Sequence, residues 1–391
     1  MEVVNTPWSD IVGGNQITTG SFARETFIFE FKTNINVSML EWFMEIDAIA
    51  EADGVYKFVI SPWENAGSGY ITMYIRDKSK VYRYITPYEK GRLGQQQYRD
   101  IMEDVSKDKG LIAYSVLNEK YLSTISYDVL GVLDDPVRKA EKSFAEVLCS
   151  PPALLKDKNT YSSSDLNVIA NELLGIEKDS YDLAVMSDNT IEFRTQNIIN
   201  RLYKDGLFIY RYRSTVSSAD KGEMHEAFSN AYKMVNKLQS MMFGAELYLS
   251  GVEEQGQSTY KFIFDYMIDG VPVNMDYIAD SDGTDAMRKL TISNAITIEA
   301  NSKMVVSCQA VLKDFEITKN THTYNLNFFD IMEDAYGMGL MNNVKRSDIN
   351  DLTFSYRVLP GDDVEKPKIV CVVTTGNGEN YSISLREKTS E

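Results

Sequence analysis

The two histidines of the sequence, His225 and His322, are the side chains on which a Ser–His–Asp or Cys–His catalytic arrangement would depend. His225 stands at the start of a segment with helical periodicity, and His322 lies in the polar run TKNTHTYN. The sequence contains neither a GxSxG nucleophile motif nor an HExxH metal-binding motif. We therefore expect both histidines to be solvated and assign no catalytic residue.

The three cysteines, Cys149, Cys308 and Cys371, lie far apart and form no CxxC pair. Their odd number argues against a framework of disulfides, and their spacing does not suit zinc. Cys308 and Cys371 sit inside apolar, alternating runs, so we expect the cysteines to pack as small buried hydrophobic residues.

An acidic stretch at 276–285, DYIADSDGTD, is the best candidate for a calcium loop. In an EF-hand loop, oxygen ligands stand at positions one, three and five and a glycine at position six. With Gly283 as the sixth residue, Asp280 and Asp282 fit, but Ile278 falls on the first position and cannot bind a cation. We interpret the stretch as an acidic surface turn and predict no metal site and no organic cofactor.

The glycines of YGMGLMN (336–342) are too few for a phosphate-binding loop, because a third glycine and a GK[ST] sequence are missing. A glycine in the left-handed region commonly ends a helix instead. We expect this stretch to be the end of a helix.

Composition describes a folded and strongly acidic protein. Of the 391 residues, 43% are apolar and 25% charged, the balance of a globular chain. The formal net charge is −17, which repels a phosphate backbone, and no cluster of Lys and Arg offsets it. We therefore expect no nucleic-acid partner and favour a protein-binding function over catalysis.

The first 90 residues read as an α+β domain. A helix is predicted between the first two strands and ends at Gly54. Alternating apolar and polar residues, the pattern of half-buried strands, predict strands at 26–32, 55–61, 70–76 and 80–86.

The middle region, 91–187, reads as mixed and mostly helical. Segments 95–107 and 135–148 favour helices, the second with Pro136 in its first turn, while 111–117 favours a strand. The stretch 151–167 combines Pro, Lys, Ser and Asp and is a candidate boundary, followed by a short helix in DLNVIANELLG.

The last region, 188–391, repeats one order of elements: a hairpin, an amphipathic helix and a second hairpin. The helices fall at 225–242 and 325–337, and Asp205–Gly206, Asp269–Gly270 and Asn377–Gly378 mark tight turns, the first of them a dipeptide favoured by type I′ turns. We predict an α+β fold of antiparallel sheets, each covered by a helix, with two tandem hairpin–helix–hairpin units in this region.

Residues 264–275, FDYMIDGVPVNM, combine an aromatic strand, a turn ending in Gly and a Val-Pro-Val strand, and they follow an Ala- and aromatic-rich helix at 227–238. With the closing stretch INDLTFSYRV…KPKIVCVVTTGNGENYSISL, this pattern resembles the YycH/YycI family of Gram-positive surface proteins, which regulate two-component systems. The resemblance covers 188–391 in plan, and the unit at 26–86 is similar to the N-terminal domain of that family.

The resemblance implies an extracytoplasmic protein, tethered by one N-terminal transmembrane helix, that regulates an essential sensor histidine kinase without catalytic residues of its own. Its partner would be the kinase or a sister YycI-like protein. This sequence departs from the family pattern because it has no run of 18 apolar residues and lacks the Trp that often follows the Pro of the closing strand, where Lys368–Cys371 stands. We expect the native protein to carry its anchor in a segment absent from this sequence and to act on the outer face of the cell membrane.

Tyrosines on predicted strands are the candidates for a partner contact, since aromatic residues supply much binding energy. They are Tyr210, Tyr212, Tyr266 and Tyr356. For Tyr210 and Tyr212 an alternative use is packing beneath the helix that carries Phe228.

Two other functions remain open. One is a carbohydrate-active protein or enzyme that uses scattered carboxylates such as Glu103–Asp104, Glu253–Glu254 and Asp362–Asp363, although solvated surface is the ordinary role of such pairs. The other is a surface lipoprotein that binds a peptide or a peptidase through an exposed sheet edge.

Overall fold

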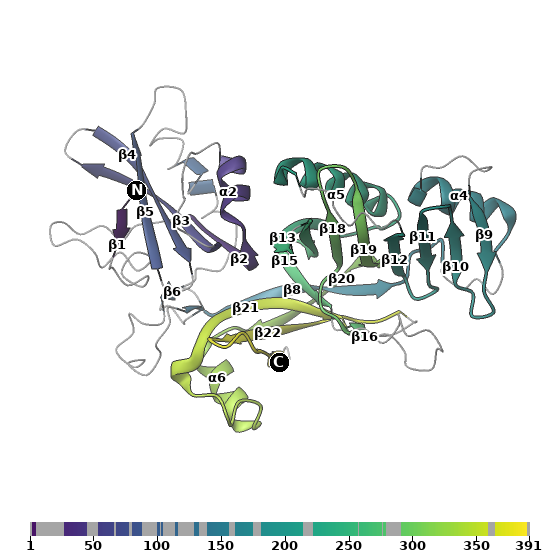
Figure 1. Ribbon diagram of the computed structural model, residues 1–391. Helices are drawn as coiled ribbons and strands as arrows, with labels where there is room; N and C mark the ends of the chain where they lie inside the picture. The colour runs from purple at the N-terminus through teal and green to yellow at the C-terminus, as the bar shows by residue number, and fades with distance from the viewer. Residues whose placement is uncertain are drawn as a thin grey trace.

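The computed structural model places the N-terminal strands in a sheet of their own (Figure 1). It describes residues 2–4, 27–44, 54–65, 68–77, 80–87, 100–101, 103–104, 114–115, 129–132, 139–155, 161–174, 181–213, 222–256, 258–275, 277–278, 291–358 and 364–388. The N-terminal sheet is antiparallel, in the order β1-β5-β4-β3-β2. Its strands are β1 (Glu2–Val4), β2 (Phe27–Ile35), β3 (Val55–Asn65), β4 (Ser68–Asp77) and β5 (Lys80–Pro87).

All four strands predicted for this region are confirmed, and helix α2 (Val37–Met44) follows β2 as expected. Ile35 and Met39, at the end of β2 and in α2, are buried in the same hydrophobic core as the C-terminal strands. The N-terminal sheet therefore joins the rest of the protein through its last strand and the helix beside it.

The helix predicted at 135–148 is wrong. Residues Glu141–Ser150 form strand β8, which pairs antiparallel with the long strand β20 (Asp314–Asn325). Phe144, Val147 and Cys149 are its buried side chains. Its Ala, Glu and Lys favour a helix locally, but cross-strand pairing with a distant segment overrides that weak preference.

The main sheet contains twelve strands in the order β23-β22-β21-β15-β14-β18-β19-β12-β11-β10-β9, with β13 paired to β14 beside this path. Its pairs are antiparallel except β15–β21, which is parallel. The strands are β9 (Asp182–Val185), β10 (Ile191–Arg194), β11 (Ile198–Leu202), β12 (Leu207–Tyr212), β13 (Glu246–Gln255), β14 (Thr259–Ile268), β15 (Val271–Met275), β18 (Ile296–Ala300), β19 (Val305–Val311), β21 (Ile349–Val358), β22 (Lys368–Thr375) and β23 (Asn380–Ser384).

Short elements complete the described fold. They are the strand pairs β6 (Tyr114–Ser115) with β7 (Leu130–Gly131) and β16 (Tyr277–Ile278) with β17 (Thr291–Ile292), and the 3-10 turn η4 (Arg346–Asp348).

Three helices cover the main sheet at different places (Figure 1). Helix α5 (Met224–Gln239) lies across β14, β18 and β19, and the apolar stripe predicted for it is buried at Ala227, Ala231, Val235 and Leu238. Helix α4 (Ser163–Leu174) lies towards the β9 end, while α6 (Phe328–Gly337) forms a second, smaller core with β21, β22 and β23. The predicted α+β class with mostly antiparallel sheets is confirmed.

The two predicted hairpin–helix–hairpin units share one sheet. The first keeps the expected order of elements, but in the second the unpredicted strand β20 stands between the hairpin and the helix. The units also pair with each other: β12 of the first pairs with β19 of the second, and β14 pairs with β18. Helix α5 consequently packs on strands from both units. The likeness of the two units as copies stays a prediction, as do the region boundaries at 90 and 187.

The turn at Asp269–Gly270 has positive φ at both residues, 48° and 74°, as a type I′ turn requires. At Asp205–Gly206 the expected type I′ turn is wrong, because only Gly206 has positive φ. There the Gly206 N–H donates to the carbonyl of Tyr203. A Cβ on Gly206 would stand 2.1 Å from the carbonyl oxygen of Leu312, so glycine is required here for space as well as for φ.

The predicted helix end at 336–342 is confirmed. Gly339 has φ +75° and its N–H donates to the carbonyl of Tyr336, while the Leu340 N–H donates to the carbonyl of Ala335. These are the two bonds of a Schellman motif. Within the described residues, no helix has the length and apolar character needed to cross a bilayer.

Candidate functional site

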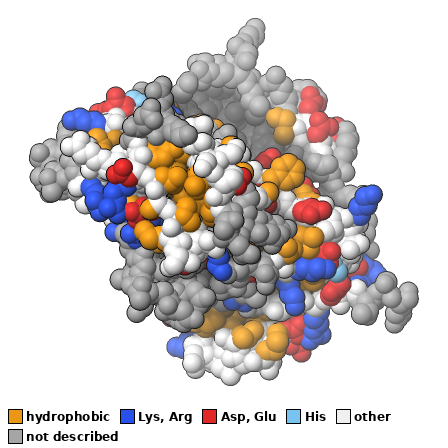
Figure 2. All heavy atoms as spheres, turned by 90° about the vertical axis from the view of Figure 1, so that its right-hand side faces the viewer, with side chains coloured by type: hydrophobic (Ala, Val, Ile, Leu, Met, Phe, Trp, Pro, Cys, Tyr) orange, Lys and Arg blue, Asp and Glu red, His pale blue; other side chains and the backbone are white. Residues whose placement is uncertain are grey.

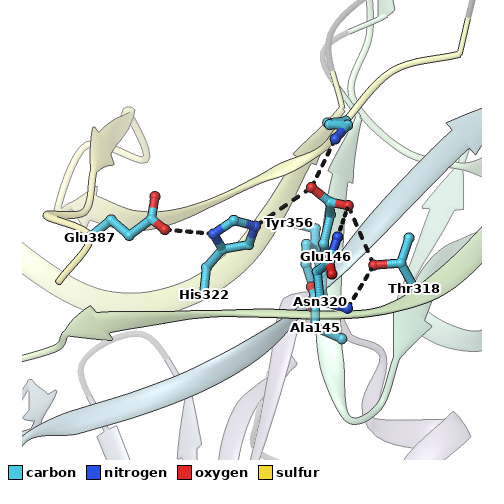
Figure 3. Close-up of polar contacts among 8 residues, drawn as sticks. Ala145, Glu146, Thr318, Asn320, His322, Tyr356 and Glu387 are labelled. Atoms are coloured by element: carbon cyan, nitrogen blue, oxygen red, sulfur yellow. Dashed lines mark hydrogen bonds and ion pairs between the residues drawn. The ribbon is translucent and has the colours of Figure 1, made fainter. Parts of the chain in front are cut away.

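The ribbon formed by β8 and β20 carries a cluster of polar side chains joined by hydrogen bonds and ion pairs. Its pairing shifts register between Ile317 and Thr321, so that residues 318–320 of β20 stand opposite the single residue Glu146 of β8. Such a bulge turns side chains out of the regular alternation. Here it brings Thr318 and Asn320 to the carboxylate of Glu146 (Figure 3).

Glu146 accepts hydrogen bonds from Lys366 Nζ at 2.9 Å, from Asn320 Nδ2 at 3.2 Å and from Thr318 Oγ1 at 3.4 Å. The hydrogen bond from Lys366, followed by that from Asn320, lowers the pKa of Glu146 to about 2. The Glu146 side chain is 14% exposed. It is therefore ionised throughout the physiological range.

His322 lies between two carboxylates (Figure 3). Its Nδ1 is 2.5 Å from Oε1 of Glu387, and its Nε2 is 3.6 Å from Oε2 of Glu146. The hydrogen bond to Glu387 is the main cause that raises the pKa of His322 above its ordinary value. As an imidazolium, His322 can donate from both nitrogens and balance both acids.

We call these side chains the ribbon cluster: Glu146, Thr318, Asn320, His322, Lys366 and Glu387. The cluster fastens distant segments to the ribbon. The Lys388 N–H donates to the carbonyl of Thr323, and main-chain bonds in both directions join Glu365 to Cys149. Tyr356 of β21 adds a bond from its hydroxyl to the carbonyl of Ala145, 3.0 Å away.

The order of groups in the ribbon cluster does not suit nucleophilic catalysis. Such a site needs a base beside the hydroxyl, with an acid orienting the base from behind. Here the Thr318 hydroxyl and the His322 imidazole each contact the acid Glu146, and among the described contacts they do not bind each other. The arrangement can hold charge and tie chain segments together.

The tyrosines predicted as partner contacts do not form one exposed surface. Tyr210, Tyr266 and Tyr356 are 9%, 1% and 2% exposed, and Tyr212 is half-buried. The hydroxyl of Tyr266 donates to the carbonyl of Val311, and that of Tyr210 to the carbonyl of Val305. The burial of Tyr210 agrees with its alternative role of packing in the core. A contact of these tyrosines with a partner stays a prediction.

The two histidines differ. His225 is exposed at the start of α5, as predicted, and its ring stacks on Trp42 of α2 with centroids 6.2 Å apart. For His322 the expectation of a merely solvated side chain is wrong, because it is 35% exposed and bound to two carboxylates. The two carboxylates that contact His322 are far away in the sequence, and the polar run TKNTHTYN was the only local signal at this position.

All three cysteines are buried free thiols, as expected. Burial raises the pKa of Cys149 to about 12 and raises the pKa values of Cys308 and Cys371 further, which leaves them protonated and poorly nucleophilic. Asp280, Asp282 and Gly283 of the acidic turn lie outside the described residues. Among the described residues no group of three or more His, Cys, Asp or Glu side chains is placed to hold a metal ion.

Comparison with known proteins finds similarity in structure alone. No family model and no curated protein matches the sequence. The crystal structure of YycH from Bacillus subtilis matches with a TM-score of 0.54 and 11% sequence identity, over 93% of this chain and 80% of that one. The chain has a YycH-like fold.

A second solved structure, an uncharacterized protein from Eubacterium rectale ATCC 33656, matches with a TM-score of 0.38 and 13% identity, over 75% of this chain and 99% of that one. A score this low carries no argument. The YycH-like fold agrees with the resemblance seen in the residues around 264–275.

Proposed function

We propose that the protein is a non-catalytic regulator that acts on the outer side of the cell membrane and modulates a membrane sensor histidine kinase by direct contact. The observation that carries the proposal is the YycH-like fold over 93% of the chain. The sequence resemblance to the YycH/YycI family supports the same function. The partner would be the outer domain of the kinase or a sister protein of the same fold.

The ribbon cluster is consistent with this function. Its imidazole and carboxylates are engaged with one another, and its charges connect β8, β20 and the C-terminal segment. A regulator that works by contact needs a surface of defined shape, and such salt links hold the ribbon in one conformation.

Binding to purified outer domains of the sensor kinases of the source organism, and to a YycI-like protein, tests the proposal. We expect saturable binding of the intact chain to one of them, and a changed autophosphorylation rate of that kinase in lipid nanodiscs. The intact chain is essential, because removing 188–391 would also remove β20, the partner of β8. Absence of binding to every domain, under both low and high salt, would contradict the proposal.

A further inference from the structure

Strand β9 ends the main sheet, and no described strand pairs with its outer side. Among the described residues it pairs with β10 alone. All of its residues are exposed, with Leu183 39% and Val185 43% accessible. An exposed edge strand with apolar side chains is a ready template for pairing with another chain.

The main-chain groups of β9 have a defined direction. The Met186 N–H donates to the carbonyl of Thr190 at 2.9 Å, just beyond the strand. In an antiparallel ladder alternate residues face the partner strand, so the N–H and C=O of Ala184 and Asp182 point towards β10. Those of Leu183 and Val185 consequently point away from the sheet, where an added strand would meet them.

On one face of the sheet the apolar layer continues to this edge and stops. Leu183 lies opposite Phe193 and Val185 opposite Ile191, and both of these β10 residues are fully buried. The β9 side chains are the last members of the same layer but remain about two-fifths exposed. A further strand with apolar residues at alternate positions would cover them and extend the core.

On the other face a row of charges reaches the edge. Arg201 and Arg194 bind the two carboxylate oxygens of Glu192, at 2.7 and 2.5 Å. Asp182 stands next in the row, opposite Arg194, on the last strand. Negative and positive side chains alternate along this row, and the next charge in it would be positive. A Lys or Arg on an added strand would therefore stand opposite Asp182.

We propose that β9 accepts an extended segment of a partner protein as an additional strand. The segment carries apolar residues opposite Leu183 and Val185 and a basic residue opposite Asp182. The inference deepens the proposed function by giving the chemistry of the partner, and it rests on that function only in requiring a protein partner.

A second copy of this chain is a poorer occupant of the edge. The sequence of β9, DLAV, offers no basic residue to meet Asp182, and two chains of net charge −17 repel each other.

Figure 2 views the side of the molecule on which β9 and α4 lie in Figure 1, and hydrophobic side chains gather near the middle of this face with charged ones around them.

The test uses a synthetic strand and requires no kinase, so its outcome is separate from that of the kinase experiment. The probe is a fluorescein-labelled peptide GTVTVKTG, in which the valines meet Leu183 and Val185 and the lysine meets Asp182. We expect saturable anisotropy changes with the intact protein. Val185→Pro removes an outward N–H without touching a bond to β10, and should weaken binding roughly tenfold or more.

Val185→Thr is the matched control, because it keeps the N–H and the shape of the side chain; its affinity should stay within roughly threefold of the wild type. Should the proline variant unfold, as judged by circular dichroism, Val185→Lys blocks the edge in another way. The proposal is overturned if the wild type does not bind the peptide or if the blocked, folded variants bind it equally well.

The charge of the partner is tested with the peptide GTVTVETG. The wild type should prefer the lysine peptide over the glutamate peptide by roughly threefold to tenfold, and Asp182→Asn should remove most of that preference. Equal affinity of the wild type for both peptides would overturn the assignment of a basic residue. Sedimentation tests the second copy as the occupant. If the wild type is a dimer and Val185→Pro makes it a monomer, the edge binds another copy of this chain, and the proposal of a different partner protein is overturned.

Discussion

Two edge strands of the main sheet, β9 and β23, differ in their side chains and in the segments that follow or precede them. At β23 the Thr374 hydroxyl donates to the Asn380 side chain, and the Tyr381 hydroxyl donates to Glu379. The chain then runs on to β20, where the Asn325 N–H donates to the carbonyl of Arg386. At β9 the apolar side chains of Leu183 and Val185 are exposed, and no described segment pairs outside it.

Among the described strands, β23 pairs with β22 alone and β9 with β10 alone, so the two edges differ in polarity and not in pairing. Residues 385–388, which follow β23, bind the ribbon through main-chain hydrogen bonds, and the ion pair of His322 with Glu387 strengthens that link. The β9 edge ends an apolar layer instead, which is the feature that makes it a candidate for binding. Three experiments test how much the regions beside the two edges contribute to stability.

The largest effect should come from the layer beneath the open edge. Phe193→Ala removes a fully buried ring that packs edge-on against Tyr181, with centroids 5.5 Å apart, and should lower the free energy of unfolding by about 3–5 kcal/mol. Leu183→Ala, on the same face of the neighbouring strand, should cost less than about 1 kcal/mol because its side chain is already partly in water. If urea unfolding gives equal losses of unfolding free energy for the two variants, Leu183 at the edge is as much a part of the core as Phe193.

The join between the sheet and the ribbon should show the next largest effect. In Gly206→Ala the new Cβ meets the carbonyl of Leu312 and the residue is strained at φ +93°, so we expect a loss of about 2–4 kcal/mol. Gly270→Ala is the control, since it has a similar φ of +74° with no atom within 4 Å, and should cost about 1 kcal/mol. Thermal unfolding of both variants measures the difference, and similar losses would mean that the close approach to Leu312 is not rigid.

The smallest effect should be the pH dependence of the segment that follows β23. The pKa of His322 is raised in the fold. The stabilisation that the charged imidazole provides is therefore complete below the unfolded pKa of about 6.5 and is lost as the pH rises through the folded pKa. The pKa of Glu146 is lowered to about 2, so its contribution is complete above about pH 4.5 and is lost as the pH falls towards 2. The ribbon cluster should therefore hold most firmly between about pH 4.5 and pH 6.5.

Hydrogen-exchange protection factors of residues 385–388 should accordingly fall a few-fold between about pH 6 and pH 9, whereas those of β10 should not. His322→Gln should remove this dependence. Protection of the wild-type C-terminal segment that is the same at both pH values would contradict the assignment of charge to His322.

The sequence by itself determined the local elements. Alternating apolar residues marked the N-terminal strands and the β18–β19 hairpin, and the 3.6-residue stripe marked α5, because side-chain direction follows from the backbone period alone. It also determined the burial of Cys308 and Cys371, which lie in apolar runs. These features depend on neighbours a few residues away.

Only the tertiary structure decided which strands pair and which side chains meet. Residues 141–148 favour a helix locally but form part of a strand because they pair with β20. Strands of the two predicted units pair with each other in one sheet. Glu146 meets Thr318 across 172 positions of the chain, and no local pattern encodes that distance. Register and pairing depend on the whole packed core, so the ribbon cluster and the open edge at β9 appear only once the chain is folded.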